Sequence, residues 1–339
     1  MKVGIIGITG SAGGELARLL LSHPEFELSE VSARSEAGRK VCDVFPYLNR
    51  CQLTIEPEIG AADLFFSALP HKSSAEICGP LVKKGKRVVD LSADFRLRDR
   101  ALFEQWYQVE HPHPELLAQA VYGLPELHCQ QIASAKLVGN PGCYPTAAIL
   151  ALAPAWSSGL AGHNVIVDAK SGVSGAGWTP TRDTQYISMN ENAYAYSMDA
   201  HRHEPEITQE LNAIKPRLRK PLELTFTPHL VPMTRGLLAT CYSKALEATS
   251  QDQLLELYRA YYAGKPFVQV VDQPPRTKWA AGNNMAYIYP HYHERTGQLV
   301  LVAAEDNLGK GAAGQAVQNA NLMCGLPEEM GLGMSALFP

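Results

Sequence analysis

The glycine-rich turn near the N-terminus constrains the fold of this 339-residue chain more than any other feature. The stretch "KVGIIGITGSAGG" joins a short apolar run, typical of a buried parallel strand, to the helical spacing of "GELARLLLSH". Gly7, Gly10 and Gly13 stand between them at GxxGxxG spacing, which lets the backbone turn tightly and approach a pyrophosphate. The helix that follows offers unpaired N–H groups and the positive end of its dipole. Alone, the motif also fits a plain tight turn.

The residues after the turn supply the context that a nucleotide site requires. "DLFFSAL" and "RVVDLSA" are strand-like, and the helix-like "SSAEICGPLVKKG" separates them. Strands that alternate with helices predict βαβ units and an α/β fold with a Rossmann-type, doubly wound parallel sheet. The first turn of such a sheet binds the nucleotide. We therefore expect the cofactor site to include Gly7, Thr9, Gly10, Ser11 and Gly13.

The end of the second expected strand, "EVSARSEAGRK", indicates which nucleotide binds. An NAD site tends to have Asp or Glu here for the ribose hydroxyls, whereas this chain has Ser32, Arg34 and Ser35. A guanidinium with hydroxyls beside it suits a 2′-phosphate. We therefore expect NADP as the cofactor, with Ser32 and Arg34 in its site. The alternative is that Arg34 is a solvated loop residue.

The middle of the chain has a different pattern, which predicts a second, α+β domain with a largely antiparallel sheet. Its strand-like runs are "NVIVDAK", "LELTFTPHLVP", "GLLATCYSKAL", "PFVQVV", "NNMAYIYP" and "QLVLVAAED". The last two are expected to pair as a hairpin across "HERTG", with Gly297 in the turn. Two helix-like segments, "EPEITQELNAI" and "QDQLLELYRAYYAG", interrupt the strands. We place the boundary between the two domains near residue 147.

Cys143 stands at a strand-to-helix junction in "GNPGCYPTAAILALAPAW". Pro145 suits the first turn of a helix, where its missing N–H costs nothing. A helix N-terminus favours the thiolate, which is the reactive form of cysteine. Its N–H groups, and the amide of Asn140, suit an oxyanion on an attacked carbonyl. We expect Cys143 to be a nucleophile. The alternative, a small buried thiol, is our interpretation of the other six cysteines.

A thiol nucleophile needs a proton partner, and the chain has 11 histidines. Those of "HPHP" (111–114) and "HYH" (291–293) are expected at the surface. His201 and His203 in "DAHRHEPEI" are better candidates, because they stand in a loop at the entrance to a helix. The spacing does not say which of the two faces the thiol. HxH also suits a metal, but no third ligand stands at a suitable spacing, so we expect no metal site.

Charge and composition argue against several classes of partner. The net charge of −4 gives no reason to expect nucleic acid or a membrane surface. Because no apolar stretch reaches the roughly 18 residues of a membrane span and the N-terminus lacks a signal-peptide core, we expect a cytoplasmic protein. The seven cysteines form no CxxC pair, which argues against a disulfide framework or a zinc site.

A nicotinamide nucleotide combined with a reactive cysteine limits the reactions that the protein is expected to catalyse. A thiol can hold an acyl group as a thioester, which hydride from NADPH reduces to an aldehyde. Nine motifs follow one another along the chain: "GITGSAGGEL", "ALPHKSSAE", "DLSADFRL", "YGLPEL", "GNPGCYPT", "SGVSGAG", "HRHEPEI", "PHLVPMTRGLLAT" and "EDNLGKGAAGQAVQN". In this order they resemble the motifs of one family, the N-acetyl-gamma-glutamyl-phosphate reductases of arginine biosynthesis. The resemblance implies NADPH-dependent conversion of a small acyl phosphate, N-acetyl-L-glutamyl 5-phosphate, to the 5-semialdehyde, with release of phosphate.

The resemblance also implies roles for particular residues. Cys143 matches the nucleophile of the family, and His203 matches its acid/base residue, with His201 secondary. Arg96 in "SADFRL" stands where related reductases hold an arginine near the phosphate, a role that suits a bidentate guanidinium. The implied substrate-binding residues are Arg96, Asn140, His201 and Arg235.

On the cofactor side, Asn307 in "EDN" is similar to a residue that orients the nicotinamide amide. Pro70 and His71 are expected to line the cofactor cleft, and the alternative for both is a purely structural role. Because Asn307 lies near the C-terminus, we expect the last helix to return to the first domain. The expected domains are thus 1–147 with 308–339 for NADP, and 148–307 for substrate binding and oligomerisation. The resemblance implies a homodimer or homotetramer, and the antiparallel sheet is the expected self-association surface.

One departure from the family pattern concerns substrate contacts. Trp178 follows "SGVSGAG", where the family usually carries a basic residue, and Arg182 is the nearest substitute. Two other functions remain open at this point. One is the same chemistry on a carrier-protein-linked aminoadipyl phosphate of lysine biosynthesis, because those reductases share the motifs. The other is a non-catalytic, NADP-binding redox sensor with Cys143 as its switch thiol.

Overall fold

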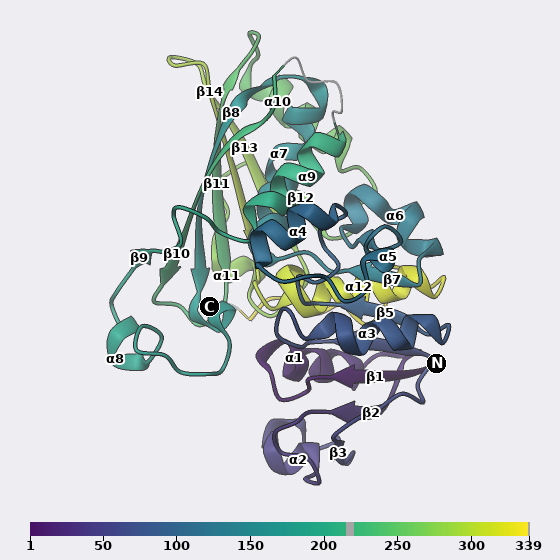
Figure 1. Ribbon diagram of the computed structural model, residues 1–339. Coiled ribbons are helices and arrows are strands. Elements are labelled where there is room, and N and C mark those ends of the chain that lie inside the picture. Colours follow the sequence, from purple (N-terminus) through teal and green to yellow (C-terminus); the bar gives the residue numbers. More distant parts are fainter. Residues whose placement is uncertain (215–219, 338–339) are drawn as a thin grey trace. The chain divides into compact units, whose positions relative to one another are not determined.

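The computed structural model describes residues 1–214 and 220–337, and the chain divides into two units (Figure 1). The first consists of Met1–Gly142 and Ala312–Gly333, and the second of Cys143–Gly311 with the residues from Met334 onward. The sequence placed the boundaries near residues 147 and 308, whereas the structure divides the chain at Gly142 and at Ala312. Cys143 is therefore the first residue of the second unit.

The first unit contains, within its described residues, a parallel sheet of seven strands. They are β1 (Lys2–Ile6), β2 (Glu27–Ser32), β3 (Ile55–Glu56), β4 (Leu64–Ser67), β5 (Arg87–Asp90), β6 (Val121–Tyr122) and β7 (Leu137–Gly139). Their order is β3-β2-β1-β4-β5-β7-β6, and each neighbouring pair is parallel. The order runs outward from β1 and β4 in opposite directions, so the expected doubly wound, Rossmann-type fold is confirmed.

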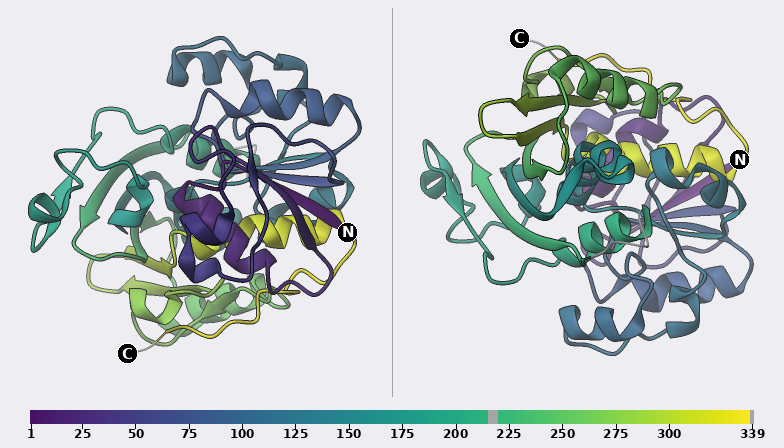
Figure 2. Two further views of the ribbon diagram at one scale, coloured as in Figure 1. Left: turned by 90° about the horizontal axis from the view of Figure 1, so that it is seen from below. Right: turned by 90° about the horizontal axis from the view of Figure 1, so that it is seen from above.

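Helices cover both faces of this sheet. They are α1 (Ser11–Leu20), α2 (Val41–Val44), η1 (Pro46–Leu48), α3 (Ser74–Lys83), α4 (Arg100–Tyr107), α5 (Pro114–Leu117), α6 (Pro125–Ser134) and α12 (Gly314–Met323). Figure 2 shows the purple α1 and the yellow α12 together on one side of the strands and the blue helices on the other. Phe65 and Val88 of the sheet pack there against Cys78 and Leu81 of α3. The C-terminal helix α12 thus belongs to the first unit.

The second unit contains a mixed, mostly antiparallel sheet, which confirms the expected α+β class. Its seven strands in the described residues are β8 (Ala161–Gly172), β9 (Tyr194–Ala195), β10 (Glu223–Val231), β11 (Leu237–Ala245), β12 (Val268–Val270), β13 (Ala286–His293) and β14 (Gln298–Glu305). Their order is β12-β13-β14-β11-β8-β10-β9, with parallel pairing only in β12·β13 and β8·β10 among these strands. The hairpin β13–β14 forms as expected, and Gly297 has φ +62° in its turn.

One face of this second sheet is covered by helices, and Figure 1 shows α7, α9 and α10 on the same side of the strands. The helical elements are α7 (Cys143–Ser158), η2 (Val173–Ala176), α8 (Tyr186–Met189), α9 (Glu204–Ile214), α10 (Gln251–Tyr261), α11 (Thr277–Ala280) and the short π-helical η3 (Gly309–Ala313). Along β8, Val165, Val167 and Ala169 are fully buried, whereas Ile166 and Asp168 between them remain accessible. Ile166 is 44% exposed on the other face of the sheet, where Asp168 and Lys170 of the same strand form an ion pair.

Candidate active site

The glycine-rich turn joins β1 to α1 with the geometry that a dinucleotide requires. Gly7 has φ +86°, and a Cβ at Gly13 would lie 2.3 Å from the Gly7 carbonyl oxygen, so both positions need glycine. A Cβ at Gly10 would approach nothing closer than 3.6 Å, which leaves the surface of the turn open. Gly10 is also the N-cap of α1, and no described side chain caps this helix. Its first N–H groups therefore suit a pyrophosphate.

The end of β2 lies directly beside this turn. The Ser32 carbonyl accepts the N–H of Gly7 at 2.8 Å, while the Ser32 side chain is buried. The Thr9 and Ser35 hydroxyls are hydrogen-bonded at 3.2 Å, and the neighbouring Arg34 is exposed. The structure thus brings two hydroxyls together next to the turn, and an exposed arginine adjoins one of them in the sequence, a set of groups that fits a 2′-phosphate.

The loops after β4 and β5 lie at the same edge of the sheet. The Ala68 carbonyl oxygen lies 2.9 Å from where a Gly7 Cβ would stand, so the β4 loop contacts the dinucleotide turn. Pro70 is exposed, and His71 Nδ1 accepts the N–H of Ala93 at 2.9 Å from the loop after β5. Pro70 and His71 therefore lie where the carboxyl ends of neighbouring strands meet, although their contact with a cofactor stays a prediction.

Arg96 and Asn140 are joined by a hydrogen bond from the Arg96 side chain to the Asn140 main chain, which the sequence did not indicate. Arg96 is 5% exposed, and it donates from Nε to the Asn140 carbonyl and from Nη2 to the Leu91 carbonyl, both at 2.7 Å. The Asn140 amide donates to the Ala312 carbonyl at 3.1 Å and accepts from Asn319 at 2.9 Å. Both side chains thus connect segments of the first unit, and their substrate-binding roles stay predictions.

Cys143 is the first residue of α7 and is partly exposed, as expected for a thiol at a helix N-terminus. A Cβ at Gly311 would lie 2.7 Å from the Cys143 Cβ and 2.9 Å from a buried Glu305 oxygen, so only glycine lets the main chain pass here. The helix dipole favours the thiolate at this position. Burial instead raises the pKa of the Cys78 and Cys241 thiols, which fits the structural role expected for them.

His201 and His203 lie in one buried aromatic cluster with the residue that follows the cysteine. Their ring centroids are 4.7 Å apart, and the Tyr144 ring lies 5.9 and 5.8 Å from them. The main-chain N–H of His203 donates to His201 Nδ1 at 3.2 Å. Tyr196 and Phe226 complete the cluster, at 5.6 and 5.1 Å from the His201 ring. The loop with both histidines is thus anchored beside the start of α7.

Burial determines the charge states in this cluster. Desolvation, with Arg202 as a second cause, lowers the pKa of His201 to about 4, so this ring is neutral at pH 7. Burial raises the pKa of Tyr144, and burial is also the main reason that the pKa of Tyr196 rises to about 12. The Tyr196 hydroxyl donates to that of Tyr144 at 3.3 Å, and Tyr144 donates to the His229 carbonyl at 2.8 Å.

His203 has a buried carboxylate nearby. Glu206 is fully buried on the first turn of α9, and its Oε1 lies 4.0 Å from His203 Nε2. At this distance the two side chains attract each other when both are charged. The His-x-x-Glu spacing in "HRHEPEI" was the available signal for this pair, because residues three apart share a helix face.

Arg235 and Asn307 lie together in the second unit. Arg235 Nε donates to both oxygens of Asp306, at 2.8 and 3.2 Å, and Asp306 is fully buried. The Asn307 side chain accepts the N–H of Gly236 at 2.8 Å and donates to the Ser174 hydroxyl at 2.9 Å. The Asn307 amide therefore has a fixed orientation, and its contact with a nicotinamide stays a prediction.

Sequence reasoning missed several side chains of the cluster. Tyr144 adjoins the nucleophile and was the easiest to find, whereas Tyr196 and Phe226 reach it from distant parts of the sequence. The expectation for His111 was wrong: it is 3% exposed, with Nε2 2.9 Å from the Asp94 carbonyl, so it is a core residue. Trp178, in contrast, is 61% exposed.

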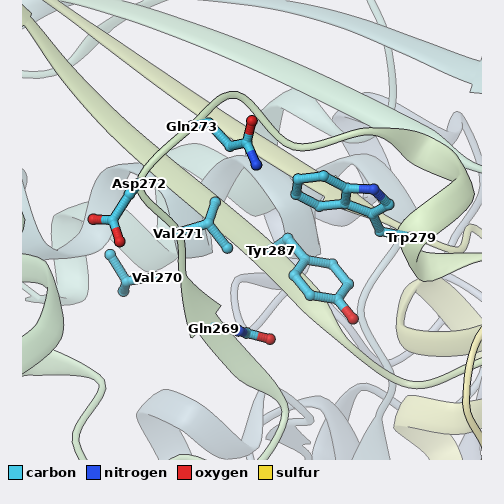
Figure 3. Close-up of a pocket in the computed structure, with 7 residues that line it drawn as sticks. All are labelled: Gln269, Val270, Val271, Asp272, Gln273, Trp279 and Tyr287. Atoms are coloured by element: carbon cyan, nitrogen blue, oxygen red, sulfur yellow. The ribbon is translucent and has the colours of Figure 1, made fainter.

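Within residues 1–214 and 220–337, no group of three or more His, Cys, Asp or Glu residues is arranged to hold a metal ion. None of the helices in these ranges has the length and apolar character of a membrane span. A cavity of about 490 Å³ lies at edge strand β12, where Trp279 stacks edge-on against Tyr287 at 5.8 Å. Its lining is Gln269, Val270, Val271, Asp272, Gln273, Trp279 and Tyr287 (Figure 3). No expected site residue lines it.

The first unit carries a dinucleotide turn and the second a partly exposed cysteine at a helix N-terminus, a combination that fits the class of nicotinamide-dependent dehydrogenases. Family models agree: "Semialdehyde dehydrogenase, NAD binding domain" matches residues 2–135, and "Semialdehyde dehydrogenase, dimerisation domain" matches residues 143–307. Curated relatives narrow the class. The N-acetyl-gamma-glutamyl-phosphate reductase of Dehalococcoides mccartyi is 50% identical over 100% of this chain and 99% of the relative. That of Heliobacterium modesticaldum is 46% identical, with 100% of both chains covered. The chain belongs to the N-acetyl-gamma-glutamyl-phosphate reductase family.

Solved structures of lower identity support the fold. Aspartate semialdehyde dehydrogenase II from Vibrio cholerae has a TM-score of 0.72 at 17% identity and covers 95% of this chain and 98% of its own. Aspartate semialdehyde dehydrogenase with NADP from Candida albicans has a TM-score of 0.70 at 17% identity, with the same coverage. At this identity the likeness establishes the fold alone.

Proposed function

We propose that this chain catalyses the NADPH-dependent reduction of N-acetyl-L-glutamyl 5-phosphate to N-acetyl-L-glutamate 5-semialdehyde, with release of phosphate, in arginine biosynthesis. One observation carries the proposal beyond family membership. Cys143 begins α7 in the same compact unit as the buried pair His201 and His203, so one unit supplies both the proposed nucleophile and its proposed proton partners. The chemistry of an acyl-phosphate reductase needs both groups.

The residues of the first unit fit NADPH. The open surface at Gly10 and the uncapped first turn of α1 suit the diphosphate, and the exposed Arg34 suits the 2′-phosphate. When bound, the cofactor supplies the hydride that reduces a thioester to an aldehyde. Asn307 is the residue of the second unit that we assign to the nicotinamide amide, because hydrogen bonds already orient its side chain.

Cys143 performs the covalent step in this proposal. Its thiolate attacks the acyl carbonyl: a C–S bond forms, the C–O bond to phosphate breaks, and phosphate leaves with that electron pair. The helix N-terminus stabilises the thiolate before attack and the oxyanion that develops during it. After the acyl carbon has been reduced, the C–S bond breaks, so the aldehyde departs and Cys143 becomes a thiolate again.

His203 moves the proton. It protonates the oxygen of the thiohemiacetal on Cys143 and takes the proton back as the aldehyde forms. The buried Glu206 carboxylate stabilises the protonated imidazole during this exchange. His201 accepts a main-chain N–H at Nδ1, so its neutral ring carries its proton on Nε2 and acts only as a donor there. We therefore assign His201 to substrate oxygen, and Arg96, Asn140 and Arg235 to the remaining polar groups of the substrate.

The substrate is tested in the reverse direction. Purified protein is mixed with NADP, inorganic phosphate and either N-acetylglutamate 5-semialdehyde or aminoadipate semialdehyde on its carrier protein. We expect phosphate-dependent formation of NADPH with the first aldehyde. Turnover only with the carrier-linked aldehyde would assign the chain to lysine biosynthesis, and NADP binding without turnover on either would favour a redox sensor.

The covalent step is tested by Cys143→Ser. The serine hydroxyl is a far weaker nucleophile at neutral pH, so turnover should fall by a factor of about 10³ or more. NADPH affinity, measured by fluorescence titration, should stay within about twofold, because the dinucleotide turn is untouched. Cys241→Ser is the matched control, since that thiol is buried in the sheet. Substantial activity in Cys143→Ser would exclude the thioester mechanism.

We also propose that the chain assembles as a homodimer or homotetramer and works in the cytoplasm. The accessible face of the second sheet, with Ile166 at 44% exposure, supports self-association because apolar sheet surface gains free energy when it is covered. A nucleophile that must stay a thiol suits the reducing conditions of the cytoplasm. The oligomeric state is measured by sedimentation equilibrium, and a monomer at micromolar concentration would contradict it.

A further inference from the structure

Lys72 has a backbone conformation that a lysine rarely adopts. Its φ is +71°, in the left-handed region, where the Cβ of any residue other than glycine is crowded. It belongs to the loop "LPHKSS" between β4 and α3, and its side chain is exposed. A glycine would adopt this φ without steric cost, so the strain calls for a reason to have a side chain here.

A buried carboxylate holds the strained residue in place. The Lys72 main-chain N–H donates to Asp94 Oδ1 at 2.7 Å, and the other oxygen of Asp94 accepts the N–H groups of Ser74 and Ala75 at 3.0 Å. Asp94 is 1% exposed. Through this network the loop after β5 fixes the loop after β4 and the start of α3. The position of the Lys72 Cα is thus determined by the core and not by its own side chain.

The loop lies at the topological switch point of the parallel sheet. β1 and β4 are neighbours, and the strand order runs in opposite directions from them. Ligands of open α/β sheets bind outside the carboxyl ends of the strands at this point. Ala68, at the start of the loop, contacts the dinucleotide turn at Gly7. The Lys72 ammonium is therefore an exposed cation at the edge where an anionic ligand is expected.

We infer that Lys72 binds a phosphate group held at this edge of the first unit, an inference that rests on the proposed reductase function and deepens it. An ammonium is a mobile point charge that suits a phosphate oxygen. Its partner is a phosphate of one of two sources, the diphosphate of NADPH or the phosphate of the acyl substrate. The strained backbone of Lys72 is then explained, because a glycine at this position would lack the ammonium that binds the phosphate.

Three variants separate charge from strain. Lys72→Met removes the charge and retains the stem and the strained backbone, whereas Lys72→Gly removes both. Lys84→Met is the matched control, because Lys84 is exposed and is the C-cap of α3, about 15 Å along the helix from its start. Each variant is measured for NADPH affinity by fluorescence titration, for the KM of inorganic phosphate in the reverse reaction, and for its thermal midpoint.

Both Lys72 variants should weaken binding of one phosphate source by about tenfold, since one charge-assisted hydrogen bond is lost. Lys84→Met should bind like the wild type. A weaker NADPH affinity identifies the diphosphate, and a higher KM for phosphate at unchanged NADPH affinity identifies the substrate. Lys72→Gly should also raise the thermal midpoint by roughly 2 °C, because it relieves strain.

Unchanged affinity for both ligands in Lys72→Met and Lys72→Gly would overturn the inference, even with a raised midpoint, since the lysine would then be only strained. Failure of the proposed function looks different: the wild type itself would form no NADPH from phosphate and the semialdehyde. In that case the NADPH titration decides about Lys72 by itself, and an affinity equal to that of the wild type overturns the inference.

Discussion

At the scale of the residue, the two histidines of "HRH" differ although they stand two positions apart. Burial keeps His201 neutral, while His203 Nε2 lies 4.0 Å from an oxygen of the buried Glu206 side chain. A neutral ring can donate a hydrogen bond but cannot supply a proton to the reaction at pH 7. This difference supports our proposal that His201 binds substrate and His203 is the acid/base residue, a choice that the spacing alone left open.

This difference predicts how each histidine affects catalysis. His203→Ala should lower kcat by a factor of about 10²–10⁴ and flatten its pH profile, because the proton carrier is lost. His201→Asn retains an acceptor near the Nδ1 position and should leave the shape of the profile between pH 5.5 and 8 unchanged. The reason is that the lowered pKa of His201, about 4, keeps the ring neutral throughout this range. The measurement is kcat against pH under saturating substrates.

The same histidine provides an independent check through stability. Between pH 6.5 and 4 the unfolded chain binds a proton at His201 that the folded chain does not, so stability falls as the pH is lowered through this window. The free energy of unfolding of His201→Asn should therefore fall less than that of the wild type over the same pH range. Asp90, whose burial raises its pKa to about 6, has the opposite effect, but it is common to both proteins and cancels in their difference.

In the kinetic experiment, a flattened kcat profile in His201→Asn instead of His203→Ala would reverse the roles that we assign to the two histidines.

At the scale of the element, the β1–α1 junction depends on two glycines for different reasons. A methyl group at Gly13 would lie 2.3 Å from the Gly7 carbonyl oxygen, whereas one at Gly10 would meet nothing within 3.6 Å. Gly13→Ala should therefore lower the free energy of unfolding by about 1–3 kcal/mol. Gly10→Ala should change it by less than about 0.5 kcal/mol and still weaken NADPH binding, because the methyl group stands where the pyrophosphate approaches.

Urea unfolding and NADPH titration of both variants measure these two effects. Equal stability of the two variants would contradict the close packing of α1 on the turn. Equal NADPH affinity of Gly10→Ala and the wild type would instead show that the pyrophosphate binds elsewhere. Gly13 is thus the glycine that the fold requires, and Gly10 is the one that cofactor binding requires.

Elements with strong local patterns were predictable from the sequence, and features that depend on distant contacts were not. The apolar runs of β1 and β4, the helix start at Cys143 and the β13–β14 hairpin follow from composition and turn residues near each other in the chain. The bond from Arg96 to the Asn140 carbonyl and the one from the Lys72 main chain to Asp94 join residues that lie 44 and 22 positions apart in the sequence. Local sequence does not encode such contacts. The candidate site residues were therefore predictable from their type and motif, whereas their hydrogen-bond partners in the folded chain were not.

At the scale of the whole molecule, the second sheet has one face under helices and one face that remains accessible. Ile166 lies in the middle of β8, between Thr225 of β10 and Tyr242 of β11, on the accessible face. Its neighbours in the strand, Val165 and Val167, are fully buried on the other face. An isoleucine that is exposed in the middle of a sheet gains free energy when another surface covers it. A second copy of the chain is our proposed cover.

This proposal predicts that a charge at Ile166 separates the copies. Ile166→Asp should shift the mass measured by sedimentation equilibrium toward that of the monomer, because an unpaired carboxylate buried at an interface costs several kcal/mol. Leu246→Asp is the matched control: Leu246 is 65% exposed and follows the end of β11, so the assembly should be unaffected. Circular dichroism checks that both variants are folded. If Ile166→Asp retains the mass of the wild-type assembly, the copies associate through another surface, and the accessible face of the sheet is left without its proposed partner.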